Sequence, residues 1–302
     1  MKDVTEALSI IAERKARAEK EYEDILTSLL QDEGFENDYR RLSYLNFEIA
    51  RREVFGLDAE DLCAEQKTLR DVVEKTLKAK GAAGLDQPRY ACAKCRDTGY
   101  VDGKKCACLE KTRIEVSLRA NGELRLVPNG LKDVDVTFYA DKAPTYLCYL
   151  KDIRKSFVKG DARFLTLIGK AGTGKTYMAL TAVKEMLLDG KMVRVINAVQ
   201  LNKVFLEYHC AYLAEKGDIW AQLVEPDVLL IDDLGAESSL KNVTEQYLYE
   251  LLAERMDKKT IVTTNLSLDA IAQKYNQRIM SRLSDKKLSG VWQIEGDDLR
   301  LK

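Results

Sequence analysis

The sequence predicts an α/β fold with a parallel sheet, and two stretches support that prediction. Residues 169–176 match the phosphate-loop pattern GxxxxGK[ST], between an apolar strand at 164–168 and an amphipathic helix that Gly190 ends. Residues 228–231 form a continuous apolar run, as expected of a strand buried in a parallel sheet, and two aspartates follow it directly. The two stretches together predict a nucleotide site at the edge of the sheet.

The phosphate loop is expected to hold a nucleoside triphosphate. Its glycines let successive backbone N–H groups turn toward phosphate oxygens at a helix N-terminus, where the helix dipole favours an anion. The Lys175 ammonium is expected to reach the β- and γ-phosphates, and the Thr176 hydroxyl to bind Mg²⁺. A chance match in a glycine-containing turn is the alternative, and the flanking strand and helix argue against it. The residues predicted to bind the nucleotide are Gly169, Lys170, Ala171, Gly172, Thr173, Gly174, Lys175, Thr176 and Asp232.

Three polar side chains beyond the loop are candidates for catalysis and magnesium binding. We expect Asp232 to complete the Mg²⁺ shell and Asp233 to polarise the attacking water, because carboxylates are costly to bury without such a use. A strand that simply meets a solvated turn is the alternative. Asn265, which ends the β-branched run 260–264, is placed to orient the water from a neighbouring strand.

Arg278 and Arg282 lie four residues apart, which puts both guanidinium groups on one helical face. Each is either a solvated surface charge or a group that stabilises transition-state charge in the site of a neighbouring subunit. The residues alone leave these two readings even.

These motifs together resemble the AAA+ helicase loaders DnaC and DnaI, with the IstB transposition ATPases as close relatives. The resemblance covers roughly the C-terminal 60% of the chain. It implies ATP and Mg²⁺ as cofactors, Asn265 as sensor 1, and Arg278 or Arg282 as the arginine finger. Asp233 stands where most AAA+ members have Glu, so the implied ATPase activity is expected to be slow and stimulated by a partner or DNA.

Four cysteines predict a metal site upstream of the loop. Cys92 and Cys95 form a CxxC pair and Cys106 and Cys108 a CxC pair, with a glycine-containing turn at 97–103 between them. Four thiolates at this spacing suit a structural, tetrahedral Zn²⁺. Disulfides and a redox CxxC are the weaker alternatives. The segment also resembles a cysteine cluster that precedes the ATPase domain in DnaI-like loaders.

Composition limits the classes of partner. The chain has 302 residues, of which 46% are hydrophobic, with 48 basic and 49 acidic side chains. A net charge near zero argues against a protein that coats nucleic acid with its whole surface, so any DNA contact must come from a local basic patch. No apolar stretch is long enough to span a membrane, and a cytoplasmic protein is expected.

We predict a helical partner-binding domain at 1–85, a four-cysteine zinc segment and linker at 86–127, and an AAA+ ATPase domain at 128–302, with a hinge at 128–130. A helical stretch is predicted at 199–223. The spacing of its aromatic residues favours packing in the core. Only the resemblance makes Lys203 and Tyr208 candidates for contact with DNA.

The resemblance implies a loader that places the replicative DNA helicase, of DnaB type, onto single-stranded DNA at the initiation of replication. It also implies self-association on DNA or on the helicase. Two alternatives remain open, namely an IstB-like transposition helper and an ATP-switched adaptor with little hydrolysis.

Overall fold

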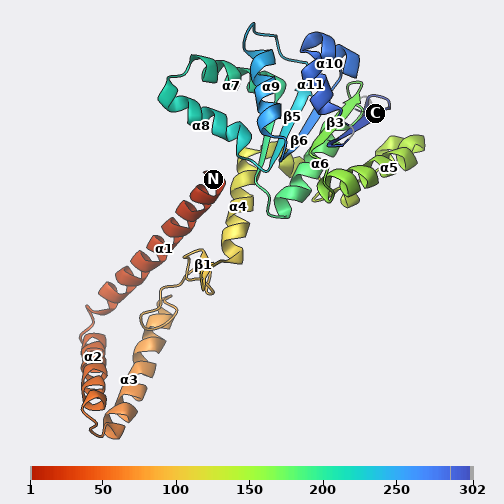
Figure 1. Ribbon diagram of the computed structural model, residues 1–302. Helices are drawn as coiled ribbons and strands as arrows, with labels where there is room; N and C mark the ends of the chain where they lie inside the picture. The colour runs from red at the N-terminus through yellow and green to blue at the C-terminus, as the bar shows by residue number, and fades with distance from the viewer. Residues whose placement is uncertain (1, 286, 300–302) are drawn as a thin grey trace. The chain divides into compact units, whose positions relative to one another are not determined.

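The computed structural model describes residues 2–285 and 287–299, and these form two compact units, residues 2–113 and the residues from 114 onward (Figure 1). The helix α4 (Ala107–Ala120) crosses the boundary between them. The assignment of functions to segments 1–85, 86–127 and 128–302 stays a prediction.

The second unit contains a five-stranded parallel sheet, which confirms the predicted α/β fold. Its strand order is β4-β5-β6-β3-β7. These strands are β3 (Phe164–Gly169), β4 (Val193–Asn197), β5 (Val228–Leu234), β6 (Lys259–Thr264) and β7 (Ser289–Ile294). The strand β6 therefore lies between the strand that precedes the phosphate loop and the strand that carries the two aspartates. The sequence analysis did not predict β7, a short edge strand that is only partly buried.

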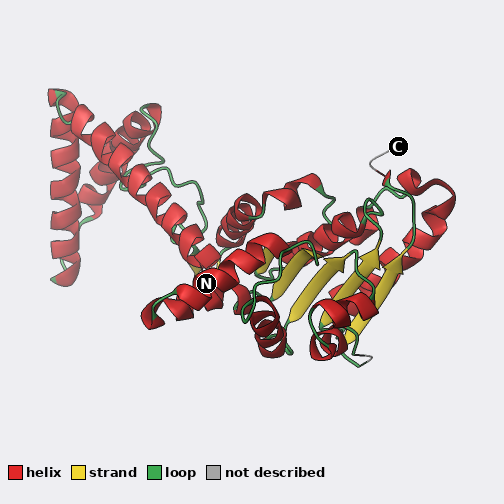
Figure 2. Ribbon diagram, turned by 90° about the horizontal axis from the view of Figure 1, so that it is seen from above, coloured by secondary structure: helices red, strands yellow, loops and turns green. Residues whose placement is uncertain are grey.

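Helices cover both faces of this sheet (Figure 2). They are α5 (Ala143–Ile153), which continues into the π-helical turn η4 (Arg154–Val158), α6 (Lys175–Leu188), α7 (Ala198–Cys210), α8 (Leu213–Val224), α9 (Thr244–Glu254), α10 (Leu268–Lys274) and α11 (Gln277–Leu283). Successive residues of one strand point to opposite faces. Leu165 and Leu230 accordingly pack in the core with α5 and α6, whereas Ile231 packs in the core with α7 to α11. Burial on both faces explains why these strands read as unbroken apolar runs.

The helical stretch predicted at 199–223 is two helices, because the chain leaves helical geometry at Ala211 and Tyr212, whose ψ angles are 153° and 152°. Tyr212 and Leu213 are 82% and 89% exposed at this break. Tyr208 packs against the rings of Trp220 and Tyr247, as the core-packing interpretation predicted.

The first unit holds three long helices, α1 (Lys2–Leu29), α2 (Glu33–Val54) and α3 (Glu60–Ala79). Gly56 and Gly81 lie in the turns that follow α2 and α3, with φ angles of 65° and 104°. The break between α1 and α2, however, is set by Asp32, whose side chain caps α2 by accepting a hydrogen bond from Phe35 N. Gly34 lies in the first turn of α2 and does not end a helix. Among the described residues, no helix is long and apolar enough to cross a membrane.

Three short 3₁₀ turns connect α4 to α5, namely η1 (Gly122–Leu126), η2 (Leu131–Asp133) and η3 (Thr137–Lys142). The predicted hinge at 128–130 lies between η1 and η2, inside the second unit. Both of its flanks are fastened to α6, because Lys184 Nζ donates to Val127 O and Leu131 N donates to Glu185 Oε2. These residues therefore do not separate two bodies.

Arg255 is fully buried beneath the amino-terminal end of the sheet. Its guanidinium donates to the carbonyl oxygens of Leu223, Val224, Pro226 and Lys259 and to Thr260 Oγ1. Burial lowers the pKa of Arg255 to about 10, so the group is still charged at neutral pH. A single cation thus satisfies five acceptors where α8, α9 and the strands meet.

We predict that Arg255→Met lowers the free energy of unfolding of the second unit by roughly 3 kcal/mol or more, because buried carbonyl groups would lose their donor. Urea unfolding followed by tryptophan fluorescence measures this, since Trp220 and Trp292 both lie in that unit. The exposed Arg125→Met is the control and should change stability little. Equal stabilities of the two variants would contradict the prediction.

Candidate nucleotide and metal sites

The phosphate loop connects the end of β3 at Gly169 to the start of α6 at Lys175. Gly172 and Gly174 have φ angles of 76° and 88°, which L side chains rarely adopt. A Cβ atom at Gly169 would lie 2.3 Å from Ile294 O of the neighbouring strand β7. The loop geometry therefore requires the glycines at these positions.

The Lys175 ammonium is held inside the loop by three oxygen atoms. It donates to Gly169 O at 2.9 Å, to Lys170 O at 2.6 Å and to Asn265 Oδ1 at 2.9 Å. The side chain is therefore directed to the centre of the loop and toward the end of β6.

Asp232 and Thr176 meet where the loop faces β5. Thr176 Oγ1 donates to Asp232 Oδ1 at 2.9 Å, and Thr263 Oγ1 donates to the same oxygen at 2.6 Å. Because the Thr176 proton points at the carboxylate, the lone pairs of its oxygen are available to a cation. A hydroxyl beside a carboxylate is an all-oxygen donor set, which fits Mg²⁺.

Asn265 joins Lys175 to Asp233. Its amide oxygen accepts from the lysine, and its Nδ2 donates to Asp233 Oδ1 at 3.0 Å. The structure therefore brings together the loop lysine, both aspartates and the asparagine, as the sequence predicted. Their catalytic roles stay predictions.

The two arginines lie outside this hydrogen-bonded cluster, on α11. Arg278 is exposed. The Arg282 guanidinium lies 4.7 Å from the ring centroid of Tyr249 on α9 and donates to its hydroxyl at 3.1 Å. Lys203, on α7, is exposed. Arg300, a candidate for a sensor 2 role, lies outside the described residues.

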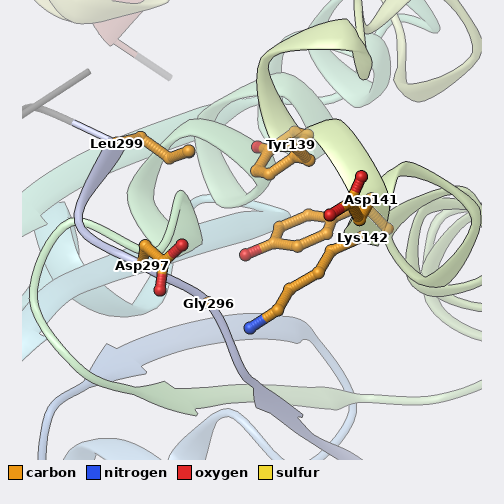
Figure 3. A pocket seen from close by; sticks show the side chains of 7 residues that line it. Tyr139, Asp141, Lys142, Gly296, Asp297 and Leu299 are labelled. Carbon is orange, nitrogen blue, oxygen red and sulfur yellow. The ribbon is translucent and has the colours of Figure 1, made fainter.

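A small pocket beside the loop involves residues that sequence analysis missed (Figure 3). Its lining residues are Tyr139, Asp141, Lys142, Tyr146, Gly296, Asp297 and Leu299. Tyr146 donates to Thr173 O at 3.0 Å, and Leu299 N donates to Gly172 O at 3.0 Å. The rings of Tyr139 and Tyr146 are stacked, and burial raises the pKa of both phenols. Local sequence contains no signal for this pocket, because its two sides are 150 to 160 residues apart.

The four predicted cysteines form one cluster in the first unit. Their sulfur atoms all lie within 4.8 Å of one another, with 3.8 Å between Cys92 and Cys106 and 3.3 Å between Cys95 and Cys108. Four sulfurs on a tetrahedral Zn²⁺ at 2.3 Å would lie about 3.8 Å apart. All four are free thiols in the structure, and their arrangement fits a metal ion.

Local contacts hold this cluster in place. The predicted turn is a hairpin of β1 (Tyr100–Val101) and β2 (Lys104–Lys105), and Asp102 and Gly103 at its tip have positive φ angles. Asp97, which is buried, accepts hydrogen bonds from Ala91 N and Cys92 N. Burial alone would raise the pKa of Cys95, but hydrogen bonds from Cys108 and the backbone outweigh it and lower that pKa to about 7. Burial, together with the hydrogen bond to Cys95, raises the pKa of Cys108.

Comparison with known proteins identifies the family. The model of the IstB-like ATP-binding proteins matches residues 105–302. The chain belongs to this family. The predicted resemblance is thereby confirmed at the family level, and the nucleotide predicted at the phosphate loop is ATP. The parallel sheet with its phosphate loop is a P-loop fold, which fits the ATP binding of this family.

Individual curated proteins match over shorter stretches. The chain is 28% identical to YdaV of Escherichia coli K12 over 142 residues, and this aligned region covers 46% of this chain and 55% of YdaV. It is 25% identical over 118 residues to the replicative helicase loader DnaC of the same strain, covering 38% and 47%. The chain thus spans about half the length of these curated relatives. Among solved structures, DnaI has a TM-score of 0.44 at 24% identity, covering 59% of this chain and 93% of that chain. The DnaC helicase loader has a TM-score of 0.45 at 19% identity, covering 55% and 97%.

We predict that Lys175→Ala weakens ATP binding about 10- to 100-fold, because it removes charge-assisted hydrogen bonds to phosphate oxygens. Binding of a fluorescent ATP analogue measures the effect. The exposed Lys151→Ala, on α5, removes the same charge elsewhere and should bind as wild type. If the two variants bind equally well, Lys175 is not a phosphate ligand.

The purified protein is expected to carry about one Zn²⁺ per chain, because four thiolates complete one tetrahedral shell. Elemental analysis of protein purified without chelator measures the ratio. Cys95→Ser should lose the metal, whereas the exposed Cys63→Ser should retain it. Metal-free wild-type protein would contradict the assignment.

Proposed function

We propose that this chain is an ATP-dependent loader that places a replicative DNA helicase of DnaB type onto single-stranded DNA at the initiation of replication. The cluster of Lys175, Asp232, Asp233 and Asn265 at one edge of the sheet carries the proposal, because it supplies the groups of an ATP-driven switch. Family membership and the match to the DnaC loader support it. Such a protein would act in the cytoplasm.

In the proposed reaction, Lys175 exchanges its carbonyl and amide partners for β- and γ-phosphate oxygens. Thr176 and Asp232 would hold Mg²⁺, which supplies charge stabilisation at the phosphates. The exchange would release the Asn265 amide to orient water, and Asp233 would polarise that water. The short Asp233 side chain favours slow hydrolysis that a partner or DNA accelerates.

The remaining parts receive roles that depend on this proposal. Residues 1–85 would grip the helicase, and Zn²⁺ on the four cysteines would stabilise the segment behind them. Chains would associate on DNA or on the helicase, so that Arg278 or Arg282 reaches the γ-phosphate of a neighbour. Exposure of Arg278 favours this residue, because Arg282 already stacks on Tyr249. Exposed Lys203 is a candidate DNA contact, whereas Tyr208 is engaged in ring packing.

A transposition helper is the second candidate, and the match to the IstB-like family model over residues 105–302 favours it. An adaptor that binds ATP and scarcely hydrolyses it is the third, and Asp233 in place of Glu favours that one. The three candidates share the nucleotide site and differ in the partner and in turnover.

Loading of the host replicative helicase onto circular single-stranded DNA, measured by unwinding of an annealed strand, tests the proposal. We predict that wild type with ATP stimulates loading. Asp233→Asn should bind ATP within about threefold of wild type yet hydrolyse it at least about 100-fold more slowly, because it keeps the site shape and loses the base. If the helicase is neither bound nor loaded while a transposase is, the helper candidate replaces the loader.

A further inference from the structure

The pairing of β5 with β6 contains an irregularity at the candidate site. It is regular up to Ile231 and resumes at Leu234, with a register shift between them. Across this gap two residues of β5, Asp232 and Asp233, stand opposite one residue of β6, Thr263. An extra residue on one strand is a β-bulge, and bulges next to active sites redirect side chains.

The Thr263 hydroxyl bonds to both residues of the bulge. It donates to Asp232 Oδ1 at 2.6 Å and accepts from Asp233 N at 2.8 Å. These directions are fixed, since a backbone N–H only donates and an ionised carboxylate only accepts. Thr263 is 1% exposed, so no water competes for these bonds.

The backbone of Asp233 needs this support. Its φ angle is 54°, in the left-handed region that is unfavourable for a residue with a side chain. The bulge also removes the regular ladder partner of the Asp233 N–H, and the Thr263 hydroxyl takes its place. The direction of the Asp233 carboxylate, which accepts from Asn265, therefore depends on a residue that does not itself reach the phosphate loop.

The neighbouring Thr264 has a different task. Its hydroxyl donates to Leu234 O at 2.6 Å and accepts from Leu266 N at 3.0 Å. It fastens the backbone beyond the bulge, whereas Thr263 holds a carboxylate.

We propose that Thr263 is a positioning residue that fixes both carboxylates of the site, and the proposal rests on the ATP and Mg²⁺ binding described above. Asp232 accepts from Thr176 on one side and from Thr263 on the other, so its oxygen is held between two hydroxyl groups. Removal of the Thr263 hydroxyl would release the Asp232 carboxylate to rotate and leave the Asp233 N–H buried without a partner. Mg²⁺-dependent binding and water activation would then weaken together, because the Thr263 hydroxyl bonds to both aspartates.

The test compares Thr263→Val, which keeps the shape and loses the hydroxyl, with Thr263→Ser, which keeps the hydroxyl. Thr181→Val is the matched control, because Thr181 is fully buried and its hydroxyl donates to Tyr177 O within α6. The affinity for a fluorescent ATP analogue is measured in EDTA and across a Mg²⁺ titration. ATP hydrolysis is a separate readout, and thermal unfolding checks that each variant folds.

Thr263→Val should need at least about tenfold more Mg²⁺ for half-maximal enhancement of ATP binding. It should also hydrolyse ATP at least about tenfold more slowly, because loss of a residue that holds a metal ligand usually has an effect of this size. Its affinity in EDTA should stay within about threefold of wild type. Thr263→Ser and Thr181→Val should behave as wild type. If Thr263→Val does not fold, Thr263→Ala removes the same hydroxyl.

Two results would overturn the proposal, namely Thr263→Val matching Thr181→Val in Mg²⁺ dependence, or Thr263→Ser failing as badly as Thr263→Val. Failure of the proposed function is recognised separately, from ATP binding and ATP hydrolysis by the wild-type chain. A wild-type chain that binds ATP with Mg²⁺ and does not hydrolyse it removes the ATPase role, and the Mg²⁺ titration still decides the role of Thr263. A wild-type chain that binds no nucleotide refutes both.

Discussion

The position of β6 between β3 and β5 is the constraint on which the candidate site depends. Polar side chains at its carboxyl end reach both neighbours, since Asn265 accepts from Lys175 on the phosphate loop and Thr263 donates to Asp232 on β5. The loop residues Lys175 and Thr176 thus belong to one hydrogen-bonded network with Asp232 and Asp233. A change at one member would alter the hydrogen bonds of the others, because the members of a hydrogen-bond network polarise one another.

The two ends of the sheet are built differently. At the amino-terminal end, Arg255 and Lys259 donate almost entirely to carbonyl oxygens, with Lys259 reaching Phe157, Gly160 and Ala162. Burial lowers the pKa of Lys259 to about 8. The carboxyl end instead gathers carboxylates, hydroxyls, an amide and the Lys175 ammonium. The cations at the amino-terminal end therefore hold carbonyl oxygens of the fold, whereas Lys175 lies among the polar side chains of the candidate site.

The cysteine cluster is self-contained within the first unit. Its four cysteines come from the CxxC turn at 92–95, from the residue that follows β2 and from the start of α4. Asp97 holds the CxxC turn by accepting hydrogen bonds from two backbone N–H groups. So small a segment buries little apolar surface, and a metal ion would supply the stability that a hydrophobic core cannot. Loss of the ion would then reduce the order of this segment without removing any residue that is predicted to bind the nucleotide.

The phosphate loop, the strand with its two aspartates, Asn265 and the four cysteines could be predicted from the sequence, because each depends on residue types at fixed local spacing. The folded chain was needed to show that α7 and α8 are separate, that residues 128–130 are fastened to α6, and that Tyr139 and Leu299 line one pocket. The role of Thr263 belongs to the same group. Two polar threonines at the end of a buried strand were visible, but the bulge that makes one of them necessary arises only when β5 and β6 pair, since register is a property of two strands.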